Sequence, residues 1–201
     1  MTRSRSAPSL STRVLQRFGL SAAPSPIYRG LVLGVVGGLI GTLAMGQYWT
    51  KIAPQVQPDE GGDEQAEPDQ NVISPLGQQH EDGERATAAL GRSAYELVAH
   101  QTPGKETRAV MSEAVHWAMG LGSGAIYGAL SARHGAGLLS GGVFGAALWL
   151  MADESLVPLL GLQDGPASTP PRGHLNRLGA HLSYGAALGL GVWALGRLAP
   201  E

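Results

Sequence analysis

The stretch Leu31–Tyr48 contains 18 residues without a charged side chain, and this feature constrains the fold more than any other. A helix needs about 20 successive apolar residues to cross the hydrocarbon core of a bilayer. Residues 135–152 form a second uncharged stretch. A helix on the surface of a soluble protein carries a polar face, and neither stretch has one. We therefore expect both segments to lie in a membrane; the alternative is a soluble helical bundle rich in glycine and alanine.

Two further stretches are mainly apolar but contain ionisable side chains. Residues 109–130 include Glu113 and His116, and residues 178–196 include His181. The sequence thus predicts an all-α fold, a bundle of four transmembrane helices. These helices are expected at residues 27–50, 109–131, 135–152 and 178–197. The first of them also has features of a cleaved secretory signal, although the roughly 30 residues before it exceed the usual length of the basic region of such a signal.

Arginines mark one end of each predicted helix. Arg29 and four earlier arginines precede the first helix, Arg133 lies in the turn between the second and third, and Arg197 follows the fourth. Basic residues near the ends of membrane helices favour the cytoplasmic side. Four crossings bring these three segments to the same side, so both termini are predicted to be cytoplasmic.

The polar segments between and before these helices have distinct compositions. Residues 1–26 form a basic tail rich in serine and proline, which we expect to be disordered. Residues 51–107 form a linker that is acidic over its first half and is expected to be external. Within the linker, small and apolar residues recur every three to four positions, which predicts an amphipathic helix at 83–100.

Glycines spaced four residues apart occur in all four predicted helices. Lipid chains are as apolar as leucine, so membrane helices associate through close contact, for which small residues at this spacing make room. The predicted packing glycines are Gly34, Gly38, Gly120, Gly124, Gly128, Gly137, Gly141, Gly145, Gly185 and Gly189. We expect these glycine seams to hold the bundle together; they can instead join two copies of the chain in a homo-oligomer.

Ionisable and polar side chains from three predicted helices are expected at a similar depth near the outer face. Depth follows from the distance to the outer end of each helix, at 1.5 Å per residue. The candidate cluster comprises Glu113, His116, Asp153, Glu154, His181 and Tyr184. On a helical projection, the first two of these continue the glycine seam of their helix, which directs them into the bundle.

Three interpretations of this cluster are open, because ionisable groups inside a membrane are costly and commonly functional. The side chains can hydrogen-bond between helices and hold them together. They can form a protonatable group that responds to pH or passes protons. They can bind a metal such as zinc, for which histidine and carboxylate are ordinary ligands. The sequence predicts no cofactor and identifies no particular metal.

Several other functions find no support in the sequence. The chain has no cysteine, which excludes a disulfide scaffold and a thiolate metal site. No serine stands in a nucleophile elbow and no glycine-rich loop has the pattern of a phosphate site. A net charge of −2 does not favour nucleic acid as a partner. We expect a protein that is not an enzyme and whose partners are the lipid bilayer and either a second copy or another membrane protein.

Four segments of the chain resemble one known family. They are GLIGTLAMGQYW (38–49), AVHWAMGLGSGAIYGAL (114–130), GGVFGAALWLMADESLVPLLGL (141–162) and AHLSYGAALG (180–189). They are similar to the YagU-like bacterial inner-membrane proteins, a family defined by a domain of unknown function. The resemblance implies a location in the inner membrane and no assigned reaction. We therefore expect a structural protein of the envelope; the alternative is a small protein that handles protons or cations through the same cluster.

Overall fold

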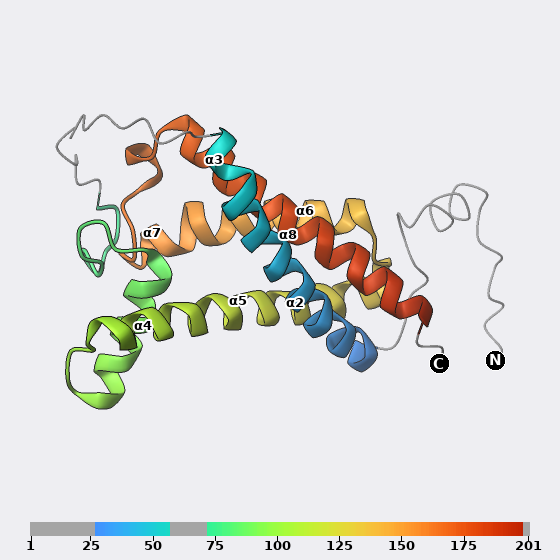
Figure 1. Ribbon diagram of the computed structural model, residues 1–201, viewed down its shortest axis with the longest axis horizontal. Coiled ribbons are helices and arrows are strands. Elements are labelled where there is room, and N and C mark those ends of the chain that lie inside the picture. The colour runs from blue at the N-terminus through green and yellow to red at the C-terminus, as the bar shows by residue number, and fades with distance from the viewer. Residues whose placement is uncertain (1–26, 57–71, 199–201) are drawn as a thin grey trace.

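The computed structural model describes residues 27–56 and 72–198, and all regular secondary structure in these ranges is helical (Figure 1). The predicted disordered tail at 1–26 and residues 57–71 of the predicted linker lie outside the described residues. In chain order the helices are α2 (Ile27–Lys51), α3 (Ala53–Val56), α4 (Ala86–Ala99), α5 (Lys105–His134), α6 (Leu138–Met151), the π-helical turn η1 (Ala152–Leu156), α7 (Val157–Leu159), the 3-10 turn η2 (Pro166–Ser168) and α8 (Pro171–Leu198).

Three helical segments are long and apolar enough to cross a membrane. They are Ile27–Val56, Leu138–Leu159 and Pro171–Leu198. The 30-residue helix α5 is not one of them, because glycine, serine and histidine dilute its apolar residues. The chain is therefore helical, with three helices suited to a membrane, and a fourth crossing by α5 stays a prediction.

The four long helices pack in the spatial order α5, α2, α8, α6. Helix α2 packs against both α5 and α8, and α6 packs against α8. Helices α5 and α6 meet near one end, where the Tyr127 hydroxyl lies 2.8 Å from Ser140 Oγ and its ring packs on Phe144. Figure 1 shows α5 and α6 separating toward their other ends, where α4 and α7 lie.

Glycines occupy the closest approaches between antiparallel helices. A Cβ atom at Gly124 would collide with the carbonyl oxygen of Gly34, and Gly30 faces Gly128 in the same way. On the other pair, Gly141 faces Gly185 of α8. Nine of the ten predicted packing glycines would place a Cβ against an atom of a neighbouring helix; the tenth, Gly137, precedes α6, and its carbonyl oxygen faces Gly189. Close backbone contact therefore joins α2 to α5 and α6 to α8.

The boundaries of the third predicted helix are wrong at both ends. The chain turns at Gly135, whose φ of 87° lies in the left-handed region that favours glycine, and α6 begins only at Leu138. At its other end, the helix does not stop at residue 152. It continues through η1 to Leu159, so that Asp153 and Glu154 lie within the helical segment rather than beyond it.

Helix α4 corresponds to the predicted amphipathic helix at 83–100, but it packs on another helix. It ends at His100, whose φ is 55° and whose backbone N–H donates to Glu96 O over 2.9 Å. Gly91 lies against Met111 of α5, and Thr87 Oγ1 lies 2.9 Å from Ser112 Oγ. The small residues of α4 therefore serve a contact with α5.

Candidate functional site

Glu154 and His174 form the tightest ionisable pair near the π-helical turn. Glu154 Oε1 lies 2.8 Å from His174 Nδ1, and the two side chains are 9 % and 24 % exposed. The other ring nitrogen, Nε2, lies 3.1 Å from the carbonyl oxygen of Pro166. A carbonyl oxygen only accepts, so Nε2 carries a proton. The contact with Glu154 then needs one further proton, held by Nδ1 or by the carboxyl group.

Asp153 and His181 form a second, looser pair. Asp153 Oδ2 lies 3.7 Å from His181 Nδ1, which is beyond hydrogen-bond distance. The same nitrogen lies 3.0 Å from the backbone oxygen of Arg177, so it carries a proton and donates it to that carbonyl. Gln163 Nε2 donates to the backbone oxygen of Asp153 over 2.6 Å. Asp153 and His181 therefore lie close together without a direct hydrogen bond, and both side chains are partly exposed.

The π-helical geometry of η1 explains why two adjacent carboxylates both reach α8. A π turn inserts one extra residue into a helix and is common at functional positions. The backbone N–H of Val157 closes this turn on Ala152 O. Asp153 and Glu154 then pair with histidines seven residues apart, which is two turns of α8. His174 is absent from the predicted cluster, although its spacing from His181 is a signal that it shares the same helix face.

Tyr184 lies apart from these pairs, at the centre of the helix packing. Its side chain is 2 % exposed. Its hydroxyl donates to Gly120 O over 2.6 Å and lies 2.9 Å from Ser123 Oγ, both on α5. Its ring packs against Gly41 of α2. Tyr184 therefore connects three helices and has no ionisable neighbour among these contacts.

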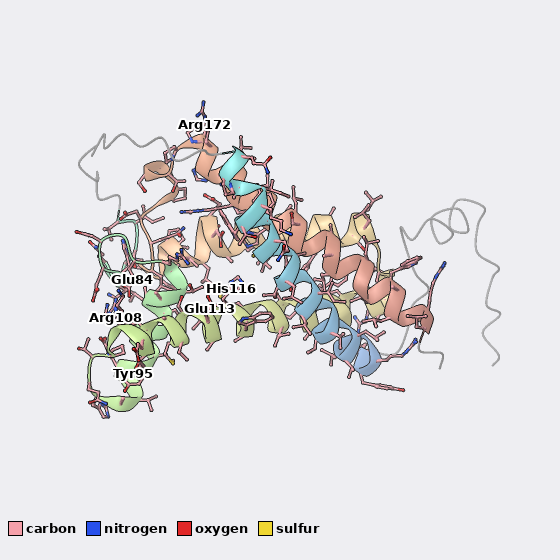
Figure 2. The ribbon with its side chains drawn as sticks, in the orientation of Figure 1. Glu84, Tyr95, Arg108, Glu113, His116 and Arg172 are labelled. Atoms are coloured by element: carbon pink, nitrogen blue, oxygen red, sulfur yellow. The ribbon has the colours of Figure 1, made fainter. Side chains whose placement is uncertain are left out.

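Glu113 and His116 do not join the other predicted site residues. Figure 2 shows both on α5, between the contact with α4 and the crossing with α2. Glu113 is exposed and His116 is half-buried, and neither forms a hydrogen bond or ion pair within the described ranges 27–56 and 72–198. The glycine contacts of α5 with α2 begin at Gly120, which follows both of these residues in the helix. The expectation of one cluster is wrong because the helices diverge.

The geometry also limits what the carboxylates and histidines can bind. Within the described part of the chain, no group of three or more histidine, aspartate, glutamate or cysteine side chains is placed to hold a metal ion. A structural zinc site takes four ligands and a catalytic site takes three. The arrangement is therefore one of separate pairs.

The segment of residues 72–85 is here called the strap. It takes part in a polar network that was not expected from the sequence. Arg92 of α4 donates to Glu84 over 2.9 Å, and Arg108 of α5 lies 2.7 Å from Glu81. On the other side, the backbone N–H of Gln79 donates to Gly161 O over 2.8 Å, and His80 Nδ1 donates to the same oxygen over 2.9 Å. The strap therefore connects α4 and α5 to the loop that follows α7.

We expect the strap to loosen in acid. Partial burial of the Glu84 carboxylate raises its pKa, but hydrogen bonds from Arg92 and from the Glu81 backbone N–H outweigh this and hold the pKa below its usual value of 4.5. A lowered pKa in the folded state stabilises that state at neutral pH, and this stabilisation is lost as the pH falls below 4.5 and through the folded value. Hydrogen exchange of the Gln79 amide measures the loss.

In the variant Glu84→Gln, the Gln79 amide should exchange its hydrogen at neutral pH as fast as the wild-type amide does in acid. Asp82→Asn is the matched control, because Asp82 is an exposed carboxylate of the same strap that accepts a 3.5 Å hydrogen bond from Gln78 Nε2. Equal protection of Gln79 in wild type and Glu84→Gln at neutral pH would contradict this role of Glu84.

Comparisons with known proteins add no relative to these observations. No protein-family model matches the chain, and no curated protein and no solved structure is similar to it. Any assignment of function therefore depends on the helices and on the contacts described above.

Proposed function

We propose that this chain is a structural protein of the bacterial inner membrane, in which carboxylate–histidine pairs fasten the helices near the outer face. Three apolar helices of spanning length support a location in a membrane. The proposed topology has α5 as a fourth span and both termini in the cytoplasm, as the distribution of Arg29, Arg133 and Arg197 favours. The inner membrane is the location that the similarity to YagU-like proteins implies.

The pair Glu154–His174 is the observation that carries this proposal. Both ring nitrogens of His174 are engaged, one with the carboxylate and one with Pro166 O. Binding of a metal ion by histidine needs a free nitrogen lone pair, and these two contacts leave none on His174. Its contacts join the end of the α6 segment to the start of α8. A pair in which both histidine nitrogens are hydrogen-bonded is suited to holding two helices together.

Removal of one member of the pair should destabilise the protein by about 2 kcal/mol. Breaking a fully buried ion pair costs about 3–5 kcal/mol, and the partial exposure of His174 reduces this value. We expect the losses for Glu154→Gln and His174→Gln not to add in the double variant, because the second change removes a group already without its partner. Unfolding in mixed micelles measures each free energy. Glu106→Gln, an exposed carboxylate at the start of α5, is the control.

The second candidate function, the handling of protons or cations, is favoured by the looser pair. Asp153 and His181 are 26 % and 14 % exposed and lie 3.7 Å apart, so water or an ion can approach both. Purified protein in liposomes, subjected to a pH gradient, separates the two proposals. Under the structural proposal, liposomes with wild type, liposomes with His181→Asn and protein-free liposomes all show the same proton and cation flux. A flux in wild type that His181→Asn abolishes while folding is intact would replace the structural proposal with the second.

A further inference from the structure

Three helix ends that carry arginine come together at one end of the molecule. Arg29, near the start of α2, donates from Nη2 to Gly196 O near the end of α8 over 2.9 Å. The next residue, Gly30, lies against Gly128 O and Ala132 Cβ near the end of α5. Figure 1 shows the start of α2 and the end of α8 on the same side of the molecule. We call this the arginine end.

The side chains of the arginine end are basic and largely exposed. Arg133 and His134 occupy the last turn of α5, and Arg197 occupies the last turn of α8; all three are exposed. Across the described ranges, every aspartate and glutamate lies within residues 81–113 or 153–164. These residues belong to the opposite end of the molecule, where α4 and α7 lie (Figure 1). The opposite end carries charges of both signs. Among the described residues, the charged side chains of the arginine end are thus basic.

An aromatic ring accompanies these charges. The guanidinium carbon of Arg197 lies 4.5 Å from the centroid of the Trp193 ring. Trp193 is half-buried and packs against the core, and its Nε1 is buried without a hydrogen-bond partner among the described residues, so its ring supports Arg197 from the protein side. Arginine then projects into the headgroup layer, where phosphate oxygens accept its hydrogen bonds. The combination matches the headgroup of an anionic phospholipid better than a dissolved anion.

We propose that the arginine end is a docking surface for anionic phospholipids, held by Arg29, Arg133 and Arg197 at the level of Trp193. This inference rests on the proposed location in a membrane. Basic side chains at the ends of α5 and α8 also compensate the partial negative charge of helix C-termini. That effect needs no particular lipid, so the preference between an anionic and a zwitterionic headgroup distinguishes the two roles.

Quenching of Trp193 by brominated lipids tests the surface. The full chain, with Trp49, Trp117 and Trp149 replaced by phenylalanine, keeps one tryptophan, beside Arg197. It is reconstituted into bilayers that contain brominated phosphatidylglycerol or brominated phosphatidylcholine at equal mole fraction. We expect phosphatidylglycerol to be preferred several-fold at Trp193. Arg197→Gln should reduce this preference roughly fivefold, the effect of about one unit charge near an anionic surface.

Two matched variants keep the result interpretable. Arg197→Lys retains the charge and should retain the preference, whereas Arg85→Gln with Lys105→Gln removes two exposed positive charges from the opposite end and should not change it. Equal quenching by the two brominated lipids in the parent protein overturns the docking surface while leaving the membrane location intact. A preference that persists in the combined variant Arg133→Gln, Arg197→Gln also overturns it. Absence of quenching by either lipid overturns the membrane location and, with it, this inference.

Discussion

Replacing Gly124 with alanine is expected to destabilise the contact between α2 and α5 by about 3 kcal/mol, the upper part of the range for overpacked helices. A Cβ atom at Gly124 would collide with Gly34 O and with the Cα and N atoms of Gly38. All of these are backbone atoms, so no side chain can rotate away to make room. The two helices must separate, and contacts along their whole interface weaken with them.

Gly122 provides a matched control on the same helix, only two residues away. A Cβ atom at Gly122 meets no atom within 4 Å. Gly122→Ala should therefore leave the stability unchanged or raise it by up to about 1 kcal/mol, because alanine is the better helix former. The free energy of unfolding in mixed micelles, measured for both variants, gives the comparison. Equal effects of the two substitutions would show that the glycine seam between α2 and α5 does not determine the stability.

The glycine spacing explains why much of the packing could be predicted from the sequence. A period of four on a helix places small residues on one face, and this rule depends only on helix geometry. The sequence therefore indicates which glycines lie at contacts. It does not indicate which helices meet, because every predicted helix carries the same signal. The order α5, α2, α8, α6 is found only in the structure.

The candidate site was harder to predict, because it depends on crossing angles and on one irregular turn. The expected single cluster required helices that stay together along their length, yet α5 and α6 meet at Tyr127 and Phe144 and separate toward the ends where α4 and α7 lie (Figure 1). Glu113 is thereby left on a part of α5 where no described residue forms a hydrogen bond or ion pair with it. The charges of Asp153 and Glu154 indicated the end of a helix, whereas the π-helical turn η1 carries both of them to histidines of α8. Neither the divergence nor the turn has a signature in residue spacing.

Tyr184 is the side chain whose loss we expect to be most costly. Replacement by alanine should destabilise the protein by about 3–5 kcal/mol, the usual cost of removing a large buried aromatic side chain. The ring is 2 % exposed and fills the space beside Gly41, and its hydroxyl reaches Gly120 O on a third helix. Collapse around the resulting cavity would require α2, α5 and α8 to move together, so the cavity should persist.

Two further variants separate the ring of Tyr184 from its hydroxyl and from general effects of tyrosine removal. Tyr184→Phe keeps the ring and should cost only about 1 kcal/mol, the typical net value of one hydrogen bond. Tyr28→Ala removes a side chain that is 73 % exposed, and a change within about 0.5 kcal/mol is expected there. Unfolding in mixed micelles measures all three. If Tyr184→Phe were as damaging as Tyr184→Ala, the hydroxyl contact with α5, and not the packing of the ring between helices, would be the main source of stability at this position.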